Sequence, residues 1–222
     1  MVFTEFFWDF DGTLFDTYGR LTRAMLKGMA DCGLKAPPEE VRSLMKVRMW
    51  RACETYAASS GGRVTPEELM QGYRRHSEEE GPESMRPYPG AADVLREILR
   101  RGGRNYIMTH RGATCLPALE REGIADCFAD MVTSEMGFPA KPAPDGLNYL
   151  IEKHGLDRRR CVMIGDRDLD LECGVNAGIA CALFDADGCG ASCPTPYAYA
   201  SMKDLLEGLV TGAEGAQERK GE

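Results

Sequence analysis

The segment 2–8 constrains this chain most, because it is rich in aromatic and β-branched residues and is followed at once by Asp9, Asp11 and Gly12. That composition is typical of a buried strand, and the glycine indicates a tight turn after it. In extended backbone the side chains of Asp9 and Asp11 share one face. Two carboxylates held so close repel each other unless a cation neutralises them, so the pattern predicts a site for a hard divalent cation such as Mg²⁺. A surface turn is the alternative, but such a turn rarely ends an apolar strand with two aspartates.

The remaining chain divides into a helical stretch and an alternating stretch. Residues 17–85 carry apolar side chains at helical spacing and show no strand signal, with helices predicted to begin near 17, 38, 48 and 65. After the proline-rich segment 86–90, short apolar segments alternate with amphipathic ones. Strands are predicted at 105–109, 128–132, 161–164 and 179–184. Helices are predicted at 91–101, 114–122, 144–154, 169–177 and 201–210.

This order of elements predicts an α/β fold, a doubly wound, Rossmann-like core with a parallel sheet and an inserted all-helical domain. The predicted strands are apolar and lack a regular polar alternation, as expected of a sheet that helices cover on both faces. Residues 1–16 and 87–222 would form the core domain, and residues 17–86 the insertion. Ligands of such sheets bind at the carboxyl ends of the strands, where Asp9, Thr109 and Asp166 are predicted to lie.

Thr109 and Lys141 both lie in motifs that suit a phosphate group. Thr109 is the first residue of the sequence Thr-His-Arg-Gly, which lies at the end of a predicted strand. We interpret the same sequence as the start of a helix. A hydroxyl together with backbone N–H groups at a helix N-terminus binds a phosphate oxygen well, although an ordinary threonine N-cap has the same sequence. Lys141 precedes a Pro-Ala-Pro-Asp helix start. A cation fixed there can neutralise a transferring phosphoryl group, whereas most lysines are only solvated.

The segment 165–170, Gly-Asp-Arg-Asp-Leu-Asp, places further acidic groups after a predicted strand. Asp166 ends that strand in the same context as Asp9. Asp170 lies four residues later, so one helical turn returns it to the same side. Asp168 points elsewhere on the helix and is predicted to be a solvated acid near the positive helix end.

The hexapeptide 9–14, Asp-Phe-Asp-Gly-Thr-Leu, resembles the first motif of the haloacid dehalogenase (HAD) superfamily of aspartyl-phosphate hydrolases. The other three motifs follow in the order that this family has. The helical insertion is similar in position and character to the cap domain of its subfamily I hydrolases. The resemblance implies that Asp9 is the nucleophile that takes the phosphoryl group and that Asp11 is the general acid and base. It also implies catalytic roles for Thr109 and Lys141.

The same resemblance implies a magnesium site and a substrate site. The implied metal ligands are Asp9, Asp11, Asp166 and Asp170. Asp11 would bind through its backbone carbonyl, and Asp170 directly or through water. The implied substrate contacts in the core are Thr109, His110 and Lys141. His110 is included only as a neighbour of the site, because the family commonly has asparagine at that position.

Candidate substrate contacts also lie in the predicted cap. Within the segment 44–51, three cations interleave with large apolar side chains; they are Lys46, Arg48 and Arg51. One interpretation is an ordinary amphipathic helix junction with solvated cations. The other is that this segment faces Asp9 when the cap closes, so that one cation contacts the non-reacting part of an anionic substrate. The stretches 15–17 and 86–90 would then be the two strands of the hinge.

The leading hypothesis is a Mg²⁺-dependent phosphatase, a HAD-like hydrolase that acts on a small phosphorylated metabolite. A haloacid dehalogenase needs no metal and lacks the second aspartate, so Asp11 argues against it. A sugar phosphomutase of the β-phosphoglucomutase type keeps all four motifs and stays an alternative. A non-enzymatic phosphometabolite-binding protein would be expected to lose a catalytic carboxylate, and none is lost here.

Composition limits the partners of the chain. A net charge of −8 over 222 residues, without a basic run, argues against nucleic-acid binding. No apolar stretch reaches the roughly 20 residues that span a membrane, and Glu5 and Asp9 interrupt the apolar start, which argues against a signal peptide. Nine cysteines without a Cys-x-x-Cys pair indicate reduced thiols. We therefore expect a cytoplasmic protein that is a monomer or a homodimer.

Overall fold

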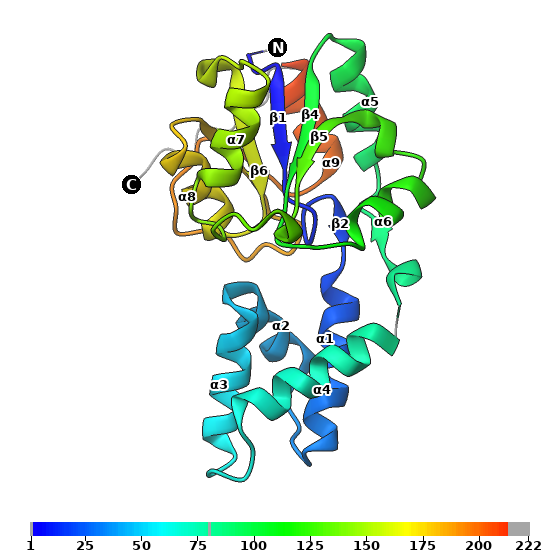
Figure 1. Cartoon of the computed structure of the whole chain (residues 1–222), viewed down its shortest axis with the longest axis vertical. Coiled ribbons are helices and arrows are strands. Elements are labelled where there is room, and N and C mark those ends of the chain that lie inside the picture. The colour runs from blue at the N-terminus through cyan, green and yellow to red at the C-terminus, as the bar shows by residue number, and fades with distance from the viewer. Residues whose placement is uncertain (1, 80, 213–222) are drawn as a thin grey trace. The chain divides into compact units, whose positions relative to one another are not determined.

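Figure 1 shows the computed structural model, which describes residues 2–79 and 81–212. The chain forms two compact units. One consists of Met1–Phe15 together with Pro87–Glu222, and the other of Asp16–Arg86. The first unit is an α/β domain, and the second is helical.

The first unit is built on a parallel sheet. Within the described residues its strands are β1 (Glu5–Trp8), β4 (Arg104–Met108), β5 (Phe128–Val132), β6 (Cys161–Gly165), β7 (Ala180–Phe184) and β8 (Ala198–Tyr199). They lie in the order β5-β4-β1-β6-β7-β8, and neighbouring strands are parallel. The chain moves outward from β1 to β5 and then returns to β6 on the other side of β1, so the strand order reverses beside β1. This doubly wound α/β arrangement confirms the predicted fold class.

Helices cover both faces of this sheet (Figure 1). They are α5 (Ala91–Arg100), α6 (Cys115–Arg121), α7 (Asp145–Lys153), α8 (Asp168–Asn176) and α9 (Met202–Leu205), with 3-10 turns at Ala125–Cys127, Ser134–Met136 and Arg158–Arg160. On one face, Phe7 and Met163 share a buried cluster with residues of α7 and α8. On the other face, the buried Asn105 side chain donates to Leu95 O of α5 at 3.2 Å and accepts from Trp8 Nε1 at 3.0 Å. Burial on both faces explains why Phe6, Phe7 and Trp8 of β1 are consecutive apolar residues, without a polar alternation.

Two features at the C-terminal side of the sheet differ from the predicted elements. Strand β8 was not predicted, because two residues are too few to show periodicity. It joins β7 through hydrogen bonds from Leu183 N to Tyr197 O and from Asp185 N to Tyr199 O, both at 2.8 Å. The helix predicted at 201–210 is α-helical only in α9 and continues as a π-helix over Leu206–Thr211.

The second unit contains α1 (Tyr18–Asp31), α2 (Pro38–Val47), α3 (Met49–Ser59) and α4 (Pro66–Glu79), and a 3-10 turn at Pro82–Ser84. Its own core includes Met25, Val41 and Leu69. Helices α1 and α4 touch backbone to backbone at Gly28 and Gly72. A Cβ added at Gly28 would lie 2.8 Å from the carbonyl carbon of Gly72, so a side chain there would push the helices apart. The strands β2 (Phe15–Asp16) and β3 (Arg86–Pro87) pair with each other where the chain enters and leaves this unit.

Two further observations concern the cysteine thiols and the length and polarity of the helices. The nine cysteines, all of them within the described residues, are free thiols. Burial raises the pKa of Cys115, Cys161 and Cys173 to about 12, so these thiols stay protonated and unreactive near neutral pH. In the described part of the chain, none of the helices is both long and apolar enough to cross a membrane.

Candidate active site

Three polar residues that follow strands lie at one edge of the sheet. Asp9 follows β1, Thr109 follows β4 and Asp166 follows β6, and these strands are neighbours. The hydrogen bonding between β1 and β6 continues past the end of β1, because the Asp9 N–H donates to Ile164 O at 2.9 Å. The backbone of Asp9 is therefore held as firmly as the strand. Since the strand order reverses beside β1, this edge is the place where doubly wound proteins bind ligands.

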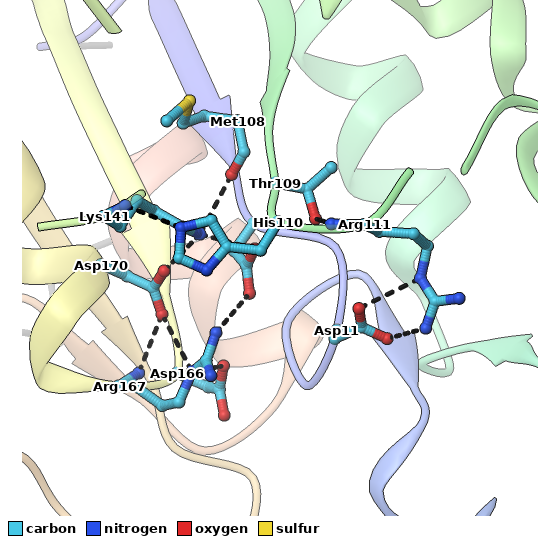
Figure 2. Close-up of polar contacts among 10 residues, drawn as sticks. Asp11, Met108, Thr109, His110, Arg111, Lys141, Asp166, Arg167 and Asp170 are labelled. Atoms are coloured by element: carbon cyan, nitrogen blue, oxygen red, sulfur yellow. Dashed lines mark hydrogen bonds and ion pairs between the residues drawn. The ribbon is translucent and has the colours of Figure 1, made fainter. Parts of the chain in front are cut away.

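A tight turn follows Asp9 and directs the next aspartate away from it. Gly12 has a φ of 80°, a left-handed conformation that favours glycine, and its N–H donates to Phe15 O at 2.8 Å. The rings of Phe10 and Phe15 stack with their centroids 4.2 Å apart. The Asp11 side chain consequently points away from the other aspartates of the site (Figure 2).

Asp9, Asp166 and Asp170 form a buried carboxylate cluster, of which Figure 2 labels Asp166 and Asp170. Each offers one carboxylate oxygen, and these oxygens lie within 4.8 Å of one another. The most exposed of the three, Asp166, is only 6% exposed. Asp170 comes from the first turn of α8, which packs tightly on β6: a Cβ added at Gly165 would lie 2.1 Å from the Cβ of Asp170. Glycine at 165 therefore allows Asp170 to approach the end of β6.

Lys141 neutralises part of this negative charge. It lies in the irregular segment before α7, and its side chain is 0% exposed. Its Nζ is 2.7 Å from Asp9 Oδ1 and 2.5 Å from Asp170 Oδ1. The ammonium also donates to Met108 O at 3.1 Å. Each of these buried charges is tolerated because it has a partner of opposite sign.

The buried charges shift one another's protonation. Burial, together with repulsion from Asp170, raises the pKa of Asp9 to about 6, despite the attraction of Lys141. Burial also opposes ionisation of Asp170, but Lys141 and Arg167 outweigh it and lower the pKa of Asp170. Lys141 lies slightly closer to Asp170 than to Asp9, which acts in the same direction as this difference. Burial works against the charge of Lys141, but Asp170 and Asp9 outweigh it and raise the pKa of the ammonium.

Arg167, which the sequence pattern did not single out, borders the cluster. Its Nη2 is 3.8 Å from Asp9 Oδ2, and its Nε is 3.8 Å from Asp166 Oδ1 and 3.7 Å from Asp170 Oδ2. These distances exceed hydrogen-bonding range, so the guanidinium balances charge without occupying those oxygens. Its place directly after Asp166, at the start of a helix, is the sequence signal that could have found it.

The cluster has the chemistry of a divalent-cation site. Asp9 Oδ2 is buried and accepts no hydrogen bond from any residue in the ranges 2–79 and 81–212. The Arg167 guanidinium lies 3.8 Å from that oxygen, beyond hydrogen-bonding range, so a cation bound directly to the oxygen would stabilise its charge further. Carboxylate oxygens are hard ligands of the kind that Mg²⁺ prefers. Asp9, Asp166 and Asp170 could therefore hold such an ion, whereas the carboxylate of Asp11 is directed elsewhere.

Thr109 and His110 do not begin a helix, so that prediction was wrong. Helix α6 begins only at Cys115, and the intervening residues form a loop after β4. The Thr109 hydroxyl oxygen accepts the Arg111 N–H at 3.1 Å. His110 Nε2 accepts the backbone N–H of Lys141 at 2.7 Å. The Thr109 hydroxyl thus fixes the start of this loop, and His110 connects the loop to the segment that carries the buried lysine.

Arg111 is a site residue that the sequence pattern did not reveal. Its guanidinium forms a two-point ion pair with Asp11, in which Nε lies 3.1 Å from Oδ2 and Nη2 donates to Oδ1 (Figure 2). Nη1 donates to Thr114 Oγ1 at 3.0 Å, and the guanidinium carbon lies 5.1 Å from the centroid of the Phe10 ring. Asp11 and Arg111 are 100 residues apart, so no local pattern links them. Arg111 therefore holds the Asp11 side chain in its present orientation.

Asp168 lies in the first turn of α8, as predicted, but it is half-buried and also binds a neighbouring loop. Its Oδ1 accepts the backbone N–H groups of Ser192 and Cys193 at 2.6 and 2.8 Å. The loop after β7 is thereby tied to the first turn of α8, the same turn that carries Asp170.

The predicted cap contacts Lys46, Arg48 and Arg51 lie at the junction of α2 and α3 in the helical unit. Lys46 Nζ lies 4.9 Å from the centroid of the Tyr18 ring, a cation–π contact within that unit. Arg48 and Arg51 are exposed. Lys46 is therefore positioned by its own unit, and the two arginines present their side chains to solvent.

The doubly wound fold, with a carboxylate cluster and a buried lysine where the strand order reverses, agrees with the family that the sequence matches. Residues 6–184 match the model of the family described as haloacid dehalogenase-like hydrolases. That range runs from β1 to β7 and contains every residue of the site. The chain is therefore an enzyme that belongs to the haloacid dehalogenase-like hydrolases, which confirms the family predicted from its motifs.

Named relatives of this chain include phosphatases. It is 29% identical over 223 residues to a phosphoglycolate phosphatase of Vibrio parahaemolyticus, covering 92% of this chain and 95% of that protein. It is 26% identical over 218 residues to the pyrophosphatase PpaX of Bacillus velezensis, covering 95% and 97%. A solved hydrolase from Streptococcus pneumoniae is 33% identical, with a TM-score of 0.64 and coverage of 83% of this chain and 94% of that one. A HAD family hydrolase from Deinococcus radiodurans, solved with bound phosphate and sodium, shares the fold with a TM-score of 0.78 at 20% identity, covering 94% and 95%.

Proposed function

We propose that this protein is a Mg²⁺-dependent phosphatase that hydrolyses a small phosphorylated metabolite through an aspartyl phosphate on Asp9. The observation that carries the proposal is the pairing of Asp9 with Lys141, a buried carboxylate 2.7 Å from a buried ammonium at the ligand-binding edge of the sheet. The relatives named phosphoglycolate phosphatase and pyrophosphatase support a phosphorylated small molecule as the substrate class. The free thiols support a reducing compartment, the cytoplasm, as the place of this reaction.

Asp9 is suited to be the nucleophile because its backbone is fixed and its carboxylate is mainly ionised at neutral pH. In the proposed first step, a carboxylate oxygen of Asp9 bonds to phosphorus while the bond from phosphorus to the leaving oxygen breaks. Lys141 stabilises the negative charge on the phosphoryl oxygens. The Thr109 hydroxyl accepts the Arg111 N–H, so its own proton can be donated to one of those oxygens. In the second step, water attacks phosphorus, the acyl–phosphate bond breaks, and phosphate leaves.

Asp11 is the proposed general acid and base. It would give a proton to the leaving oxygen in the first step and take one from the attacking water in the second. In the structure its carboxylate is paired with the guanidinium of Arg111. The proposal therefore requires the Asp11 side chain to turn from Arg111 to the reacting oxygen during each turnover.

Mg²⁺ is the proposed cofactor. Asp9 and Asp166 would hold it together with the backbone carbonyl of Asp11, and Asp170 would support it directly or through water. The hard oxygen donors of the cluster and the buried Asp9 Oδ2 fit such an ion. When bound, the ion supplies positive charge that offsets the charges of the carboxylates and of the phosphoryl group.

Magnesium binding should weaken in acid, because protons and the cation compete for Asp9, whose pKa without metal is about 6. Below that pH the ionised fraction of Asp9 falls, so the apparent Kd for Mg²⁺ should rise roughly tenfold per pH unit. Above pH 7 the Kd should be nearly constant. Isothermal titration calorimetry from pH 5 to pH 8 measures this, with Asp9→Asn as the control that lacks the titrating ligand. An affinity that does not change below pH 6 would contradict the assignment of Asp9 as a ligand.

Phosphate release from a panel of phosphorylated metabolites tests the proposed function. With Mg²⁺ present and no sugar bisphosphate added, at least one small phosphoester should be hydrolysed, and excess chelator should stop the reaction. A sugar phosphomutase would instead isomerise its substrate and require a bisphosphate activator. If no phosphoester is hydrolysed although Mg²⁺ binds, the phosphatase proposal is wrong and a binding protein is favoured.

The helical unit Asp16–Arg86 is the proposed cap domain, which recognises the non-reacting part of the substrate through Lys46, Arg48 or Arg51. Replacing the relevant cation with Ala should lower kcat/KM for the substrate found in the panel about 10- to 100-fold, because a charge-assisted hydrogen bond is lost. Turnover of a simple aryl phosphate, which has no second anionic group, should barely change. Arg74→Ala in α4 is a matched control, because Arg74 is also an exposed cation of this unit.

Two results would contradict this role of the cap cations. Equal losses on both substrates would mean that the substitution damages the fold or the core site. Wild-type kcat/KM in all three Ala variants would mean that none of these cations contacts the substrate.

A further inference from the structure

His110 lies within the site but has no part in the proposed phosphoryl transfer. Its imidazole turns towards the segment that carries Lys141 (Figure 2). Nε2 accepts the backbone N–H of Lys141 at 2.7 Å, and the two residues are 31 positions apart in the sequence. Because an amide can only donate, the ring must present an unprotonated Nε2 and carry its proton on Nδ1.

The segment around Lys141 is poor in backbone donors that could hold it. Positions 139, 142 and 144 are prolines, which have no N–H. Ala143 N–H closes a local turn on Ala140 O at 3.0 Å, and Asn176 Nδ2 donates to Pro142 O at 3.0 Å. Both contacts hold neighbours of Lys141. The bond to His110 ties the Lys141 amide itself to the end of β4.

The end of β4 thus holds Lys141 at two points. Met108 O accepts a hydrogen bond from Nζ at 3.1 Å, and His110 accepts one from the backbone N–H. The residues on either side of Thr109 therefore define where the ammonium lies relative to Asp9. Since the lysine side chain is 0% exposed, a shift of its backbone would displace Nζ rather than be absorbed by another rotamer.

We propose that His110 is a positioning residue, whose neutral imidazole anchors the Lys141 backbone so that Nζ stays against the Asp9 carboxylate. The catalytic importance of this anchor rests on the proposed function. Burial, together with the charges of Lys141 and Arg167, lowers the pKa of His110 to about 4, so the acceptor at Nε2 persists at neutral pH. This role is more specific than that of a neighbour of the substrate site, for which the resemblance included His110.

Two substitutions of similar size test whether His110 is needed as a hydrogen-bond acceptor or only fills space. Glutamine can place Oε1 near the position of Nε2 and accept the same N–H, whereas leucine has no acceptor. His110→Gln should keep kcat within about threefold of wild type. His110→Leu should lower kcat about 10- to 100-fold with little change in KM, because a small displacement of a catalytic group can cost about 10²-fold. If the leucine variant does not fold, His110→Asn replaces it, since its amide is too short to reach the same position.

Hydrogen exchange of the Lys141 amide, followed by NMR, measures the anchor without any substrate. Exchange should be slow in the wild type and in His110→Gln, and at least about tenfold faster in His110→Leu. If no phosphoester is hydrolysed but this exchange pattern is found, the proposed function is wrong and the anchor stands. The positioning role is wrong if His110→Leu leaves the exchange unchanged, or if both variants lose kcat equally at wild-type melting temperature. A raised KM with unchanged kcat would overturn it in favour of direct substrate contact.

Discussion

Asp9→Asn is expected to abolish turnover while the protein stays folded. The amide keeps the shape of the carboxylate but cannot attack phosphorus to form the acyl phosphate. The loss in kcat should be on the order of 10⁴-fold or more, as is typical when the nucleophile of a covalent mechanism is removed. Phosphate release at saturating substrate and Mg²⁺ measures the loss. Turnover within about tenfold of wild type would exclude Asp9 as the nucleophile.

The stability of the Asp9→Asn variant tests whether the wild-type protein buries an ionised Asp9. Burial is the main reason why the pKa of Asp9 is raised to about 6, so ionised Asp9 destabilises the folded protein. Such a group binds protons more tightly in the folded state, so its contribution to stability falls as the pH rises from about 4, its unfolded value, to about 6. Thermal unfolding of the metal-free proteins at pH 4.5 and pH 7 should show this loss in the wild type and a smaller loss in Asp9→Asn. A larger loss in the variant would contradict the proposed burial of an ionised Asp9.

Lys141→Met is expected to lower both activity and stability. Methionine has a similar length and no charge, so the nearest cation left to Asp9 and Asp170 within the described residues would be the guanidinium of Arg167, at 3.8 and 3.7 Å. Removing one partner from a buried ion pair costs about 3–5 kcal/mol in the free energy of unfolding. Loss of a preorganised cation at the reacting group should lower kcat about 10²- to 10³-fold. Chemical denaturation of the metal-free protein and phosphate release measure the two effects.

A double variant distinguishes a catalytic lysine from a merely structural one. Adding Asp170→Asn to Lys141→Met removes one of the two stranded carboxylates, so part of the lost stability should return. Turnover should stay low, because the phosphoryl group still lacks its cation. If the double variant regains turnover along with stability, the loss in the single variant was structural. A kcat within about threefold of wild type in Lys141→Met alone would remove Lys141 from the mechanism.

The fold class and the edge of the sheet where the polar residues gather could be predicted from the sequence. Strand composition, helical periodicity and the alternation of elements are short-range patterns, so each is visible within a few consecutive residues. Parallel pairing then brings the carboxyl ends of the strands to one edge, which is why Asp9, Thr109 and Asp166 were expected there. The two-residue strand β8 has no such pattern, and only its pairing with β7 defines it.

The partners of the charged groups were decided by the tertiary structure. Arg111 pairs with Asp11 because the loops after β1 and β4 approach each other, and Asp168 binds the backbone at Ser192 because the loop after β7 reaches the first turn of α8. The sequence around each residue contains no matching signal, since the two members of each pair come from separate segments of the chain. For the same reason, the place of Thr109 in a loop rather than at a helix start could not be read from its own motif.

The burial of Lys141 was likewise decided by tertiary structure. In the sequence it is a lysine before a proline-rich helix start, a pattern equally compatible with a solvated side chain. Packing of the doubly wound core places it between Asp9 and Asp170 and brings His110 to its backbone. The strength of such interactions depends on distance and on exclusion of water, and sequence spacing determines neither of these.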